Sequence, residues 1–455
     1  MSSNKPHAQP PEKLTGIKLD KIPESAVGVK AIKSALSHIT SEVGLDKGVG
    51  LLAKLNQTDG FDCPGCAWPD PDEKRAFLAE YCENGAKAVA EEATKNRVSP
   101  MFFATHSVKE LSTLSDYEIG KKGRITHPMV LHEGKDHYEE ISWEDAFHMI
   151  GEELNGLDSP NEAIFYTSGR TSNEAAFLYQ LFVRQFGTNN LPDCSNMCHE
   201  SSGAALSETL GIGKGSVTLD DFNHADLVIV IGQNPGTNHP RMLTALGETK
   251  KKGGQIITIN PLPEVGLMRY NDPQNPLKWI GKGQKLTDIF LQVKINGDVA
   301  LLKIIMKLLL EKEQEVPGSV FDHDFIKEKT QGYDEFIADL EKYSIPDLLP
   351  QTGLQLDEIQ AAANMIASKK KIIICWAMGL TQHKNAVDNI REFVNILLLK
   401  GSIGKEGAGT CPVRGHSNVQ GDRTVGIWES APQAFLNKIE AKYLDFLLSA
   451  DELMV

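Results

Sequence analysis

The stretch that decides the fold is Leu227-Val-Ile-Val-Ile-Gly-Gln-Asn-Pro-Gly-Thr237. Its first five residues are apolar and largely β-branched, which is typical of a short strand buried on both faces. The turn-forming residues that follow end the strand. Because a helical segment at 242–251 and a second apolar run at 255–259 come next, the stretch predicts a βαβ unit with parallel strands.

The same alternation of strand and helix extends in both directions along the chain. Alternation of this kind predicts an α/β protein, multidomain, with parallel-sheet βαβ cofactor-binding domains. The further predicted strands are 163–167 and 371–376, and the further predicted helices are 142–154, 173–186, 201–210, 299–311, 356–368 and 385–399.

A length of 455 residues predicts two to four domains, and 41% hydrophobic residues with 24% charged residues exclude a disordered chain. We expect a small N-terminal domain that carries Cys63 and Cys66, ahead of the α/β domains. The expected division is an N-terminal arm at 1–48, the small domain at 49–135, an α/β domain at 136–285 that contains Cys198 and is discontinuous with parts of 370–435, a second α/β domain at 286–435, and an atypical tail at 436–455.

The charge of the chain excludes several classes of partner. The 47 Lys and Arg residues against 61 Asp and Glu residues give a net charge of −14, which disfavours nucleic acid and anionic lipid. No apolar run approaches the about 20 residues that span a bilayer. The N-terminus carries neither an apolar signal region nor a twin-arginine pair. We therefore expect a cytoplasmic protein that acts on a small molecule.

Four turn-forming segments follow predicted strands. Ligands of parallel α/β sheets gather at the carboxyl ends of strands, where helix N-termini present free N–H groups. The segments therefore indicate a large phosphate-bearing cofactor, although each one by itself could be an ordinary turn. Neither a nucleotide-binding G-x-G-x-x-G after a strand nor a P-loop is present. The four segments are 168–170, 232–237, 260–262 and 378–382.

Two groups of cysteines suggest metal chemistry. Cys63-Pro-Gly-Cys66 can turn two thiolates toward one iron–sulfur or zinc site, with Cys82 as a possible third ligand. The alternative is a pair of inert or redox-labile thiols. Cys198 offers a soft ligand to a metal, and His199 beside it could relay a proton. The alternative there is a buried cysteine followed by a histidine that begins a helix.

A glycine-punctuated loop, 407–421, carries amide and guanidinium donors. Such a loop allows its backbone to approach a polar ligand closely, or it is simply a surface loop.

Several blocks of residues together are similar to one protein family. The chain resembles the molybdopterin oxidoreductases, and most closely their formate dehydrogenase alpha subunit-like FdhF/YdeP branch, from about Asp59 to about Ala434. The blocks are Tyr166-Thr-Ser-Gly-Arg-Thr-Ser-Asn-Glu-Ala-Ala176, Gly187-Thr-Asn-Asn190, Asp193-Cys-Ser-Asn-Met-Cys-His-Glu200, Gly232-Gln-Asn-Pro-Gly-Thr-Asn-His-Pro-Arg241 and Arg414-Gly-His-Ser-Asn-Val-Gln-Gly421.

The resemblance implies a Mo-bis(molybdopterin guanine dinucleotide) cofactor and a [4Fe-4S] cluster. It places Cys198 as the molybdenum ligand and His199 as the adjacent proton-transfer residue. Cys63, Cys66 and Cys82 are then the available iron–sulfur ligands. The residues that it places on loops holding the pterin dinucleotides are Ser168, Gly169, Arg170, Gln233, Asn234, Pro235, Asn260, Gly379, Gln382, Asn418, Gln420 and Gly421.

The resemblance further implies a two-electron oxidation of a small, formate-like substrate, with a redox partner or an accessory sulfurtransferase as possible protein partners. Two other functions stay open: a non-catalytic or impaired cofactor-binding protein of acid stress, and a zinc-binding scaffold at Cys63 and Cys66. Full-length members of the family continue into a C-terminal β-barrel domain, which residues 436–455 do not resemble. We therefore expect a truncated chain with a partly exposed cofactor cleft.

Overall fold

The computed structural model describes residues 21, 23–72, 75–76, 79–275, 279 and 281–443. Residues 1–20 of the expected arm and 444–455 of the expected tail lie outside these described residues. Within the described ranges, no helix combines the length and the apolar character needed to cross a membrane.

A five-stranded parallel sheet forms the centre of the fold, in the order β10-β7-β6-β11-β12. The predicted α/β class is thus confirmed. Ile231 is the register partner of both Ile259 and Trp376, so the three central strands end at the same level. The strands are β6 (Leu227–Ile231), β7 (Gln255–Ile259), β10 (Ile289–Leu291), β11 (Ile372–Trp376) and β12 (Gly409–Pro412).

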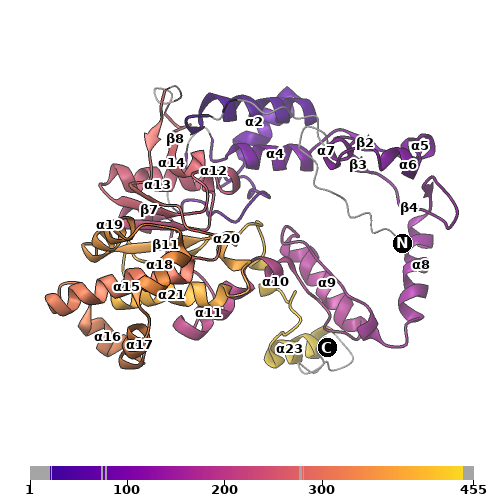
Figure 1. Cartoon of the computed structure of the whole chain (residues 1–455). Helices are drawn as coiled ribbons and strands as arrows, with labels where there is room; N and C mark the ends of the chain where they lie inside the picture. Colours follow the sequence, from indigo (N-terminus) through magenta and orange to yellow (C-terminus); the bar gives the residue numbers. More distant parts are fainter. Residues whose placement is uncertain are drawn as a thin grey trace, which may run out of the picture.

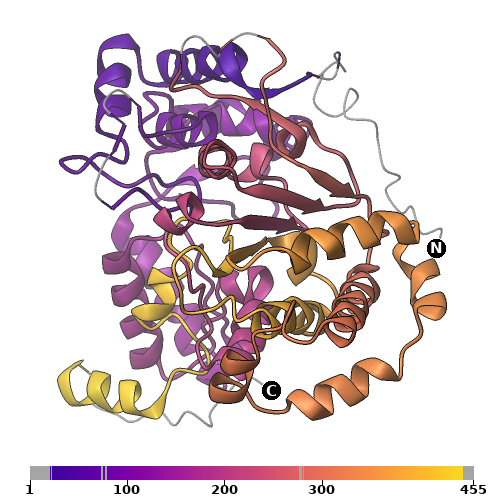
Figure 2. The same ribbon diagram turned by 90° about the vertical axis from the view of Figure 1, so that its left-hand side faces the viewer.

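Helices cover both faces of this sheet (Figure 2). Ile229 and Ile231 of β6 point into the larger apolar core, with α15 (Asp298–Glu315), α19 (Leu356–Ala367) and α21 (Ala386–Leu399). Val228 and Val230 point into the opposite core, with α13 (Met242–Lys251). Each such fully buried side chain contributes roughly 1.5–3 kcal/mol. Burial on both faces explains why β6 is apolar at every position.

The sheet joins segments on both sides of the expected domain boundary at 285/286, because β10 pairs with β7 and β11 pairs with β6. Strand β12 follows at the edge, beside β11. In the N-terminal part, α2 (Gly28–Glu42) packs against α4 (Glu83–Glu92) in a separate apolar core, across the expected boundary at 48. The division into domains as a whole stays a prediction.

The remaining elements are short or peripheral. They are α3 (Leu45–Lys54), α5 (Pro100–Thr105), α6 (Val108–Leu111), α7 (Asp116–Gly120), α8 (Trp143–Asn155), α9 (Asn173–Phe186), α10 (Cys194–Cys198), α11 (Glu200–Leu210), α12 (Pro235–Asn238), α14 (Val265–Met268), α16 (His323–Lys329), α17 (Tyr333–Glu341), α18 (Ile345–Thr352), α20 (Met378–Thr381), α22 (Gly421–Thr424) and α23 (Gln433–Tyr443), with 3-10 turns η1 (Pro160–Glu162) and η2 (Asp220–Asn223), and strands β1 (Ala26–Val27), β2 (Arg97–Val98), β3 (Arg124–Ile125), β4 (Met129–Val130), β5 (Glu139–Glu140), β8 (Arg269–Asn271) and β9 (Gln284–Lys285).

The predicted strand at 163–167 is wrong. Its backbone makes one backbone–backbone bond to the described segment at 189–193, from the N–H of Phe165 to the carbonyl of Asn190 (2.9 Å), and one isolated bridge at Thr167. Ile164 and Tyr166 are 66% and 50% exposed. An apolar run becomes a strand only where another strand pairs with it, and the described residues provide none here.

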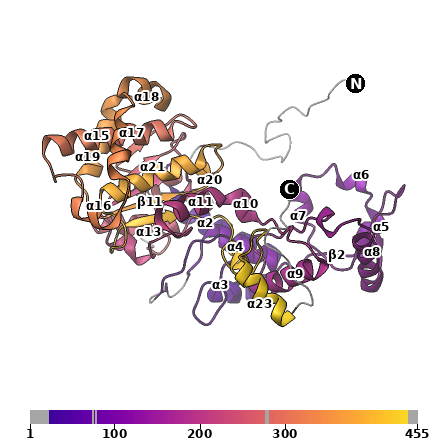
Figure 3. The same cartoon turned by 90° about the horizontal axis from the view of Figure 1, so that it is seen from below.

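Helix α8 lies away from the central sheet in both Figure 1 and Figure 3. Ser142 caps its N-terminus as the sequence predicts, by accepting the N–H of Asp145. None of its residues is buried, and Trp143 and Phe147 are each 65% exposed. Among the described residues, only its C-terminal end has an apolar partner, because Leu154 packs against the cluster that contains Phe165 and Val183. Most of its apolar stripe, including Trp143 and Phe147, is exposed.

Glu313, near the C-terminal end of α15, provides a test of the fold. Burial alone would raise the pKa of its carboxyl. The N–H groups of Phe321, Gly318 and Val320 and the His323 imidazole outweigh burial and hold the pKa at about 2.

We expect Glu313→Gln to cost about 1–3 kcal/mol at pH 7, as measured by thermal unfolding. Because the folded pKa is depressed, this stabilisation is present above the unfolded pKa of 4.5 and is lost as the pH falls toward about 2. The difference between variant and parent should shrink over that window. Glu315→Gln, an exposed change in the same helix turn, is the control.

Candidate functional site

Three of the predicted loops meet at the carboxyl edge of the sheet, where β6, β7 and β11 end together. The N–H of Gly379 donates to the carbonyl of Gly232 at 3.0 Å. Gly232 has a φ of +59°, and a Cβ there would lie 3.0 Å from the backbone of Gly379. The close approach of the two loops thus requires glycine.

A cavity of about 270 Å³ opens between these loops. Four predicted cofactor-binding residues line it: Gln233, Asn234, Asn260 and Gly379. The side-chain oxygen of Gln233 is buried and has no hydrogen-bond partner within the described residues. A buried acceptor without a partner favours a polar ligand at this position.

Two residues of this cavity, Asp298 and His383, were not identified from the sequence. Asp298 begins α15 and is only 5% exposed. Burial raises the pKa of its carboxyl to about 6, and the nearby His383 opposes the rise. An acidic residue in the first turn of a helix is common, so the sequence carried no distinctive signal. The cavity can therefore offer a carboxylate to a ligand that presents N–H donors.

Cys198 is the last residue of α10 and is 6% exposed. Burial raises the pKa of its thiol, while the N–H of Gly415 and the charge of Arg414 oppose that rise. The Cys198 carbonyl accepts the hydroxyl of Thr381 at 2.5 Å, and Gln382 donates to the Met197 carbonyl at 2.9 Å. The predicted metal ligand is thus tied to α20, which also borders the cavity.

The predicted loops at Ser168–Arg170 and Asn418–Gly421 are in contact with each other. The N–H of Asn418 donates to the carbonyl of Gly169 at 2.7 Å. A Cβ on Gly169 would lie 2.3 Å from Val419 and 2.7 Å from the Cys194 sulfur. Arg170 donates to the Gly65 carbonyl at 3.3 Å, which brings the Cys63–Cys66 loop to the same region.

The sequence interpretation missed two polar features here. The Cys194 sulfur lies 2.9 Å from Nδ1 of His416. The carboxyls of Asp193 and Asp422 are fully buried, and burial together with the Asp193 charge raises the pKa of Asp422 to about 6. Asp193 and Cys194 lie close to Cys198 along the chain, but their partners Asp422 and His416 are distant in the sequence. The spacing of residues therefore could not reveal these contacts.

His199 is placed in the protein interior, at 1% exposure. Its Nε2–H donates to the Val413 carbonyl (3.1 Å), and its Nδ1 accepts the hydroxyl of Ser202 (2.9 Å), which in turn accepts from Trp376. Burial lowers the pKa of the ring to about 3. The ring is therefore neutral with a fixed tautomer, and a proton relay through His199 would require one of these bonds to open.

The thiols of Cys63, Cys66 and Cys82 lie in one region of the small N-terminal part. Burial raises the pKa of Cys82 to about 11, and the proximity of Cys66 and Cys63 adds to the rise. However, no group of three or more His, Cys, Asp or Glu side chains among the described residues is arranged to hold a metal ion. A [4Fe-4S] cluster usually takes four thiolates. The iron–sulfur site and the zinc scaffold stay predictions.

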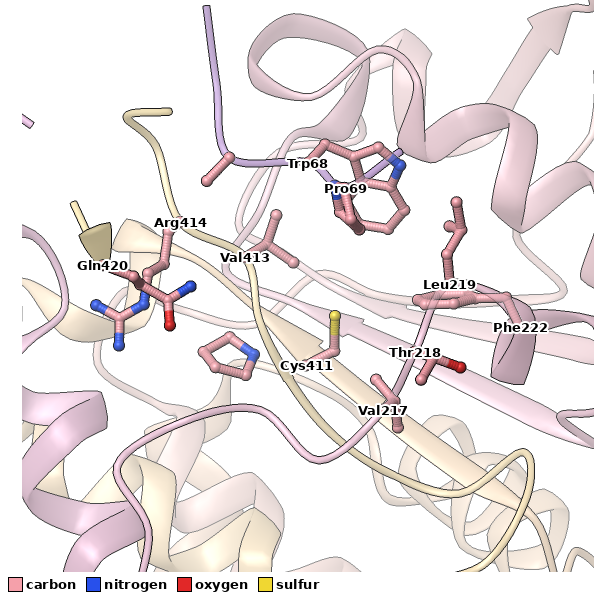
Figure 4. Close-up of a pocket in the computed structure, with 12 residues that line it drawn as sticks. Trp68, Pro69, Val217, Thr218, Leu219, Phe222, Cys411, Val413, Arg414 and Gln420 are labelled. Atoms are coloured by element: carbon pink, nitrogen blue, oxygen red, sulfur yellow. The ribbon is translucent and has the colours of Figure 1, made fainter. Parts of the chain in front are cut away.

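A second cavity, of about 60 Å³, lies beside Arg414 and Gln420 (Figure 4). Trp68 and Phe222 form its apolar wall, and Cys411 of β12 borders it. The cavity lies next to the Arg414–Gly421 segment. It therefore borders the Cys198 region, the name used below for Cys198 and the residues Arg414 and Gly415 that face its sulfur.

Gly169 allows a test of the contact between loops. We expect Gly169→Ala to destabilise the chain by about 1–3 kcal/mol, because the added methyl group overlaps Val419 and Cys194. Thermal unfolding measures the effect. Gly203→Ala is the matched control, since a Cβ there meets nothing within 4 Å and alanine favours the helix α11. Equal stability of the two variants would contradict the close packing of the loops.

The fold and the site define a class of protein: an α/β protein whose loops gather at the carboxyl edge of a parallel sheet around a polar cavity. The chain belongs to the molybdopterin oxidoreductase family, because the family model "Molybdopterin oxidoreductase" matches residues 124–427. Membership in this family implies a molybdopterin cofactor.

Characterised and uncharacterised relatives are similar over most of the chain. "Uncharacterized oxidoreductase Rv2900c" of Mycobacterium tuberculosis is 55% identical over 92% of the chain and 54% of its own length. "Protein YdeP" of Escherichia coli is 46% identical over 94% of the chain and 56% of its own length. The "F420-dependent formate dehydrogenase 1 subunit alpha" of Methanococcus maripaludis is 29% identical over 77% of the chain and 49% of its own length. The chain spans about half the length of these relatives.

The structure of "Acetylene Hydratase from Pelobacter acetylenicus" is similar in fold, with a TM-score of 0.53 and 20% identity. The similarity covers 67% of this chain and 39% of that one. It supports the α/β fold assigned above.

Proposed function

We propose that the chain is a molybdenum-dependent oxidoreductase, similar to formate dehydrogenase, that oxidises a small formate-like substrate by two electrons at a Mo-bis(molybdopterin guanine dinucleotide) centre. The observation that carries the proposal is the position of Cys198. Its buried sulfur faces the N–H of Gly415 and the Arg414 charge, at the point where the loops at 168–170, 378–382 and 415–421 converge.

The residues around Cys198 fit a thiolate ligand of a metal. A thiol must lose its proton to bind a metal, and the N–H of Gly415 and the guanidinium of Arg414 both favour the charged sulfur. When bound, the molybdenum centre supplies the two-electron chemistry, while the protein supplies orientation and electrostatics. Arg414 would also attract a small anionic substrate such as a carboxylate.

The cavity at the carboxyl edge of the sheet supports the guanine dinucleotide form of the cofactor. Guanine presents two adjacent N–H donors on one edge, and a carboxylate can accept both. Asp298 is a buried carboxylate in this cavity. The side-chain oxygen of Gln233 adds an acceptor that has no partner among the described residues. Asn234, Asn260 and Gly379 would line the rest of the dinucleotide site.

Metal and pterin analysis tests the proposal. The chain is to be purified from a host that makes the molybdenum cofactor, and its molybdenum, pterin fluorescence and guanine nucleotide are to be measured. We expect one molybdenum and two guanine nucleotides per chain. Protein with neither molybdenum nor pterin would overturn the proposal.

A further inference from the structure

Two cysteines outside the Cys198 region stand side by side in the sheet. Cys375 of β11 and Cys411 of β12 are register partners in neighbouring parallel strands. Both side chains pack on the same face, against the apolar cluster that contains Val230 and Ile373. Neighbouring strands are about 5 Å apart, within the Cα separation that a disulfide bond accepts. The register therefore permits a cross-link.

The two thiols are neighbours across the β11–β12 pair. Burial raises the pKa of Cys375 well above its ordinary range, and a hydrogen bond with the Cys411 side chain raises it further. All seven cysteines are free thiols in this structure. A contact between two thiols in the interior needs little backbone movement to become a covalent bond.

The two thiols differ in access. Cys375 is fully buried, at 0% exposure, on a strand that has neighbours on both sides. Cys411 is partly exposed, lies on the edge strand β12, and borders the cavity of about 60 Å³ beside Trp68 (Figure 4). A cavity of this size holds a molecule of a few heavy atoms, such as hydrogen peroxide.

We propose that Cys375 and Cys411 form a redox-active dithiol, which a hydroperoxide oxidises to an intramolecular disulfide. Cys411 is the attacking thiol, because it alone of the pair borders the cavity. Cys375 is the resolving thiol behind it.

The chemistry balances with hydrogen peroxide as the oxidant. The Cys411 thiolate forms a bond to one peroxide oxygen, the O–O bond breaks, and the leaving hydroxide takes the Cys411 proton as water. The Cys375 sulfur then attacks the sulfenic acid sulfur, the S–O bond breaks, and the second hydroxide leaves with the Cys375 proton. Two thiols and one peroxide thus give one disulfide and two water molecules.

The segment that follows Cys411 connects the cross-link to the Cys198 region. Strand β12 continues directly into Val413 and Arg414, whose carbonyls accept bonds from His199 (3.1 Å) and His239 (2.8 Å). The N–H of Gly415 faces Cys198. A disulfide fixes the two sulfurs about 2.05 Å apart, so its formation reorients the Cys411 side chain. We expect the change to reach Val413 and Arg414, which lie two and three residues further along the chain. The influence of the cross-link on the Cys198 region rests on the proposed function. The formation of the cross-link does not.

Peptide mapping of the full chain tests the proposal without any bound cofactor. The reduced chain is treated with hydrogen peroxide, remaining thiols are alkylated, and the digest is analysed by mass spectrometry before and after reduction. We expect a linked pair of peptides that contain Cys375 and Cys411, lighter by two hydrogens and separated by dithiothreitol. Free Cys411, or Cys411 joined to another cysteine, would overturn the proposal.

Three variants identify the role of each thiol. With Cys375→Ala, the sulfenic acid of Cys411 should accumulate and be trapped by dimedone. With Cys411→Ala, Cys375 should stay reduced. Cys66→Ser is the matched control, because Cys66 packs against the same apolar cluster and is the competing thiol; the yield of the 375–411 link should stay within about twofold of the parent. Disappearance of the link in this control would overturn the direct attack of Cys411, because Cys66 would then be the thiol that the peroxide oxidises first.

The coupling to the Cys198 region has its own readout. The alkylation rate of Cys198 is to be compared between the cross-linked and the reduced chain. A change of about threefold or more supports the coupling, and equal rates remove it while the cross-link stands.

Discussion

Cys198→Ser is expected to lower turnover of the cofactor-loaded chain by at least about 100-fold, since a hydroxyl is a poor replacement for a thiolate ligand of a soft metal. The expected loss is confined to the metal, because the cavity around Asp298 and Gly379 does not include Cys198. Guanine nucleotide content should therefore stay within about twofold of the parent, while dye-linked oxidation of formate disappears.

Cys411→Ser is the control for this change, because it also replaces a thiol by a hydroxyl, on β12 rather than in α10. It should keep its molybdenum. Full activity of Cys198→Ser would show that Cys198 does not ligate the metal. Equal loss in both variants would point to damage to the fold, which circular dichroism of each variant would reveal.

Asp298→Asn should lower the retention of guanine nucleotide by about 10- to 100-fold, which corresponds to the loss of a charge-assisted pair of hydrogen bonds. The amide that replaces the carboxylate accepts only one bond and turns an N–H group toward the donors of guanine. Nucleotide released by acid from the purified protein, counted per chain, measures the effect.

The same variant should make the cofactor-free chain more stable. The folded pKa of Asp298, about 6, lies above its unfolded value of 3.8, so the cost of burying the charge is absent below about pH 3.8 and complete above about pH 6. Removing the charge should stabilise the free chain at pH 7.5 by on the order of 2 kcal/mol. A variant that is more stable than the parent without cofactor, but that retains less guanine nucleotide, would identify Asp298 as a binding residue.

Asp357→Ala is the matched control, because Asp357 also stands in the first turn of a helix, α19, but is exposed and outside the cavity. Both its nucleotide content and its pH dependence of stability should follow the parent. Unchanged nucleotide retention in Asp298→Asn would exclude Asp298 from the dinucleotide site.

The sequence by itself determined the elements whose signals are local. The bounds of β6, β7, α9 and α13 agree with those predicted, because a strand buried on both faces and a capped amphipathic helix each leave a pattern within one short segment. The loops after β6, β7 and β11 could be anticipated for the same reason. Parallel strands end at one edge, so turns that follow them meet there.

Tertiary structure decided what depends on partners distant in the chain. The run at 163–167 has the composition of a strand, but pairing is a property of two segments, and among the described residues the run makes only one isolated bridge, at Thr167. His199 stands beside Cys198 in the sequence, yet the fold turns it inward to Val413 and Ser202. Asp298 looked like an ordinary helix-start residue until packing placed it in the cavity.

The physical reason is the range of the interactions. Propensity, capping and apolar periodicity act over a few residues and are legible in the sequence. Strand order, the burial of a carboxyl and the register that sets Cys375 beside Cys411 depend on segments up to 145 residues apart, as with Leu227 and Ile372, which only the folded chain brings together.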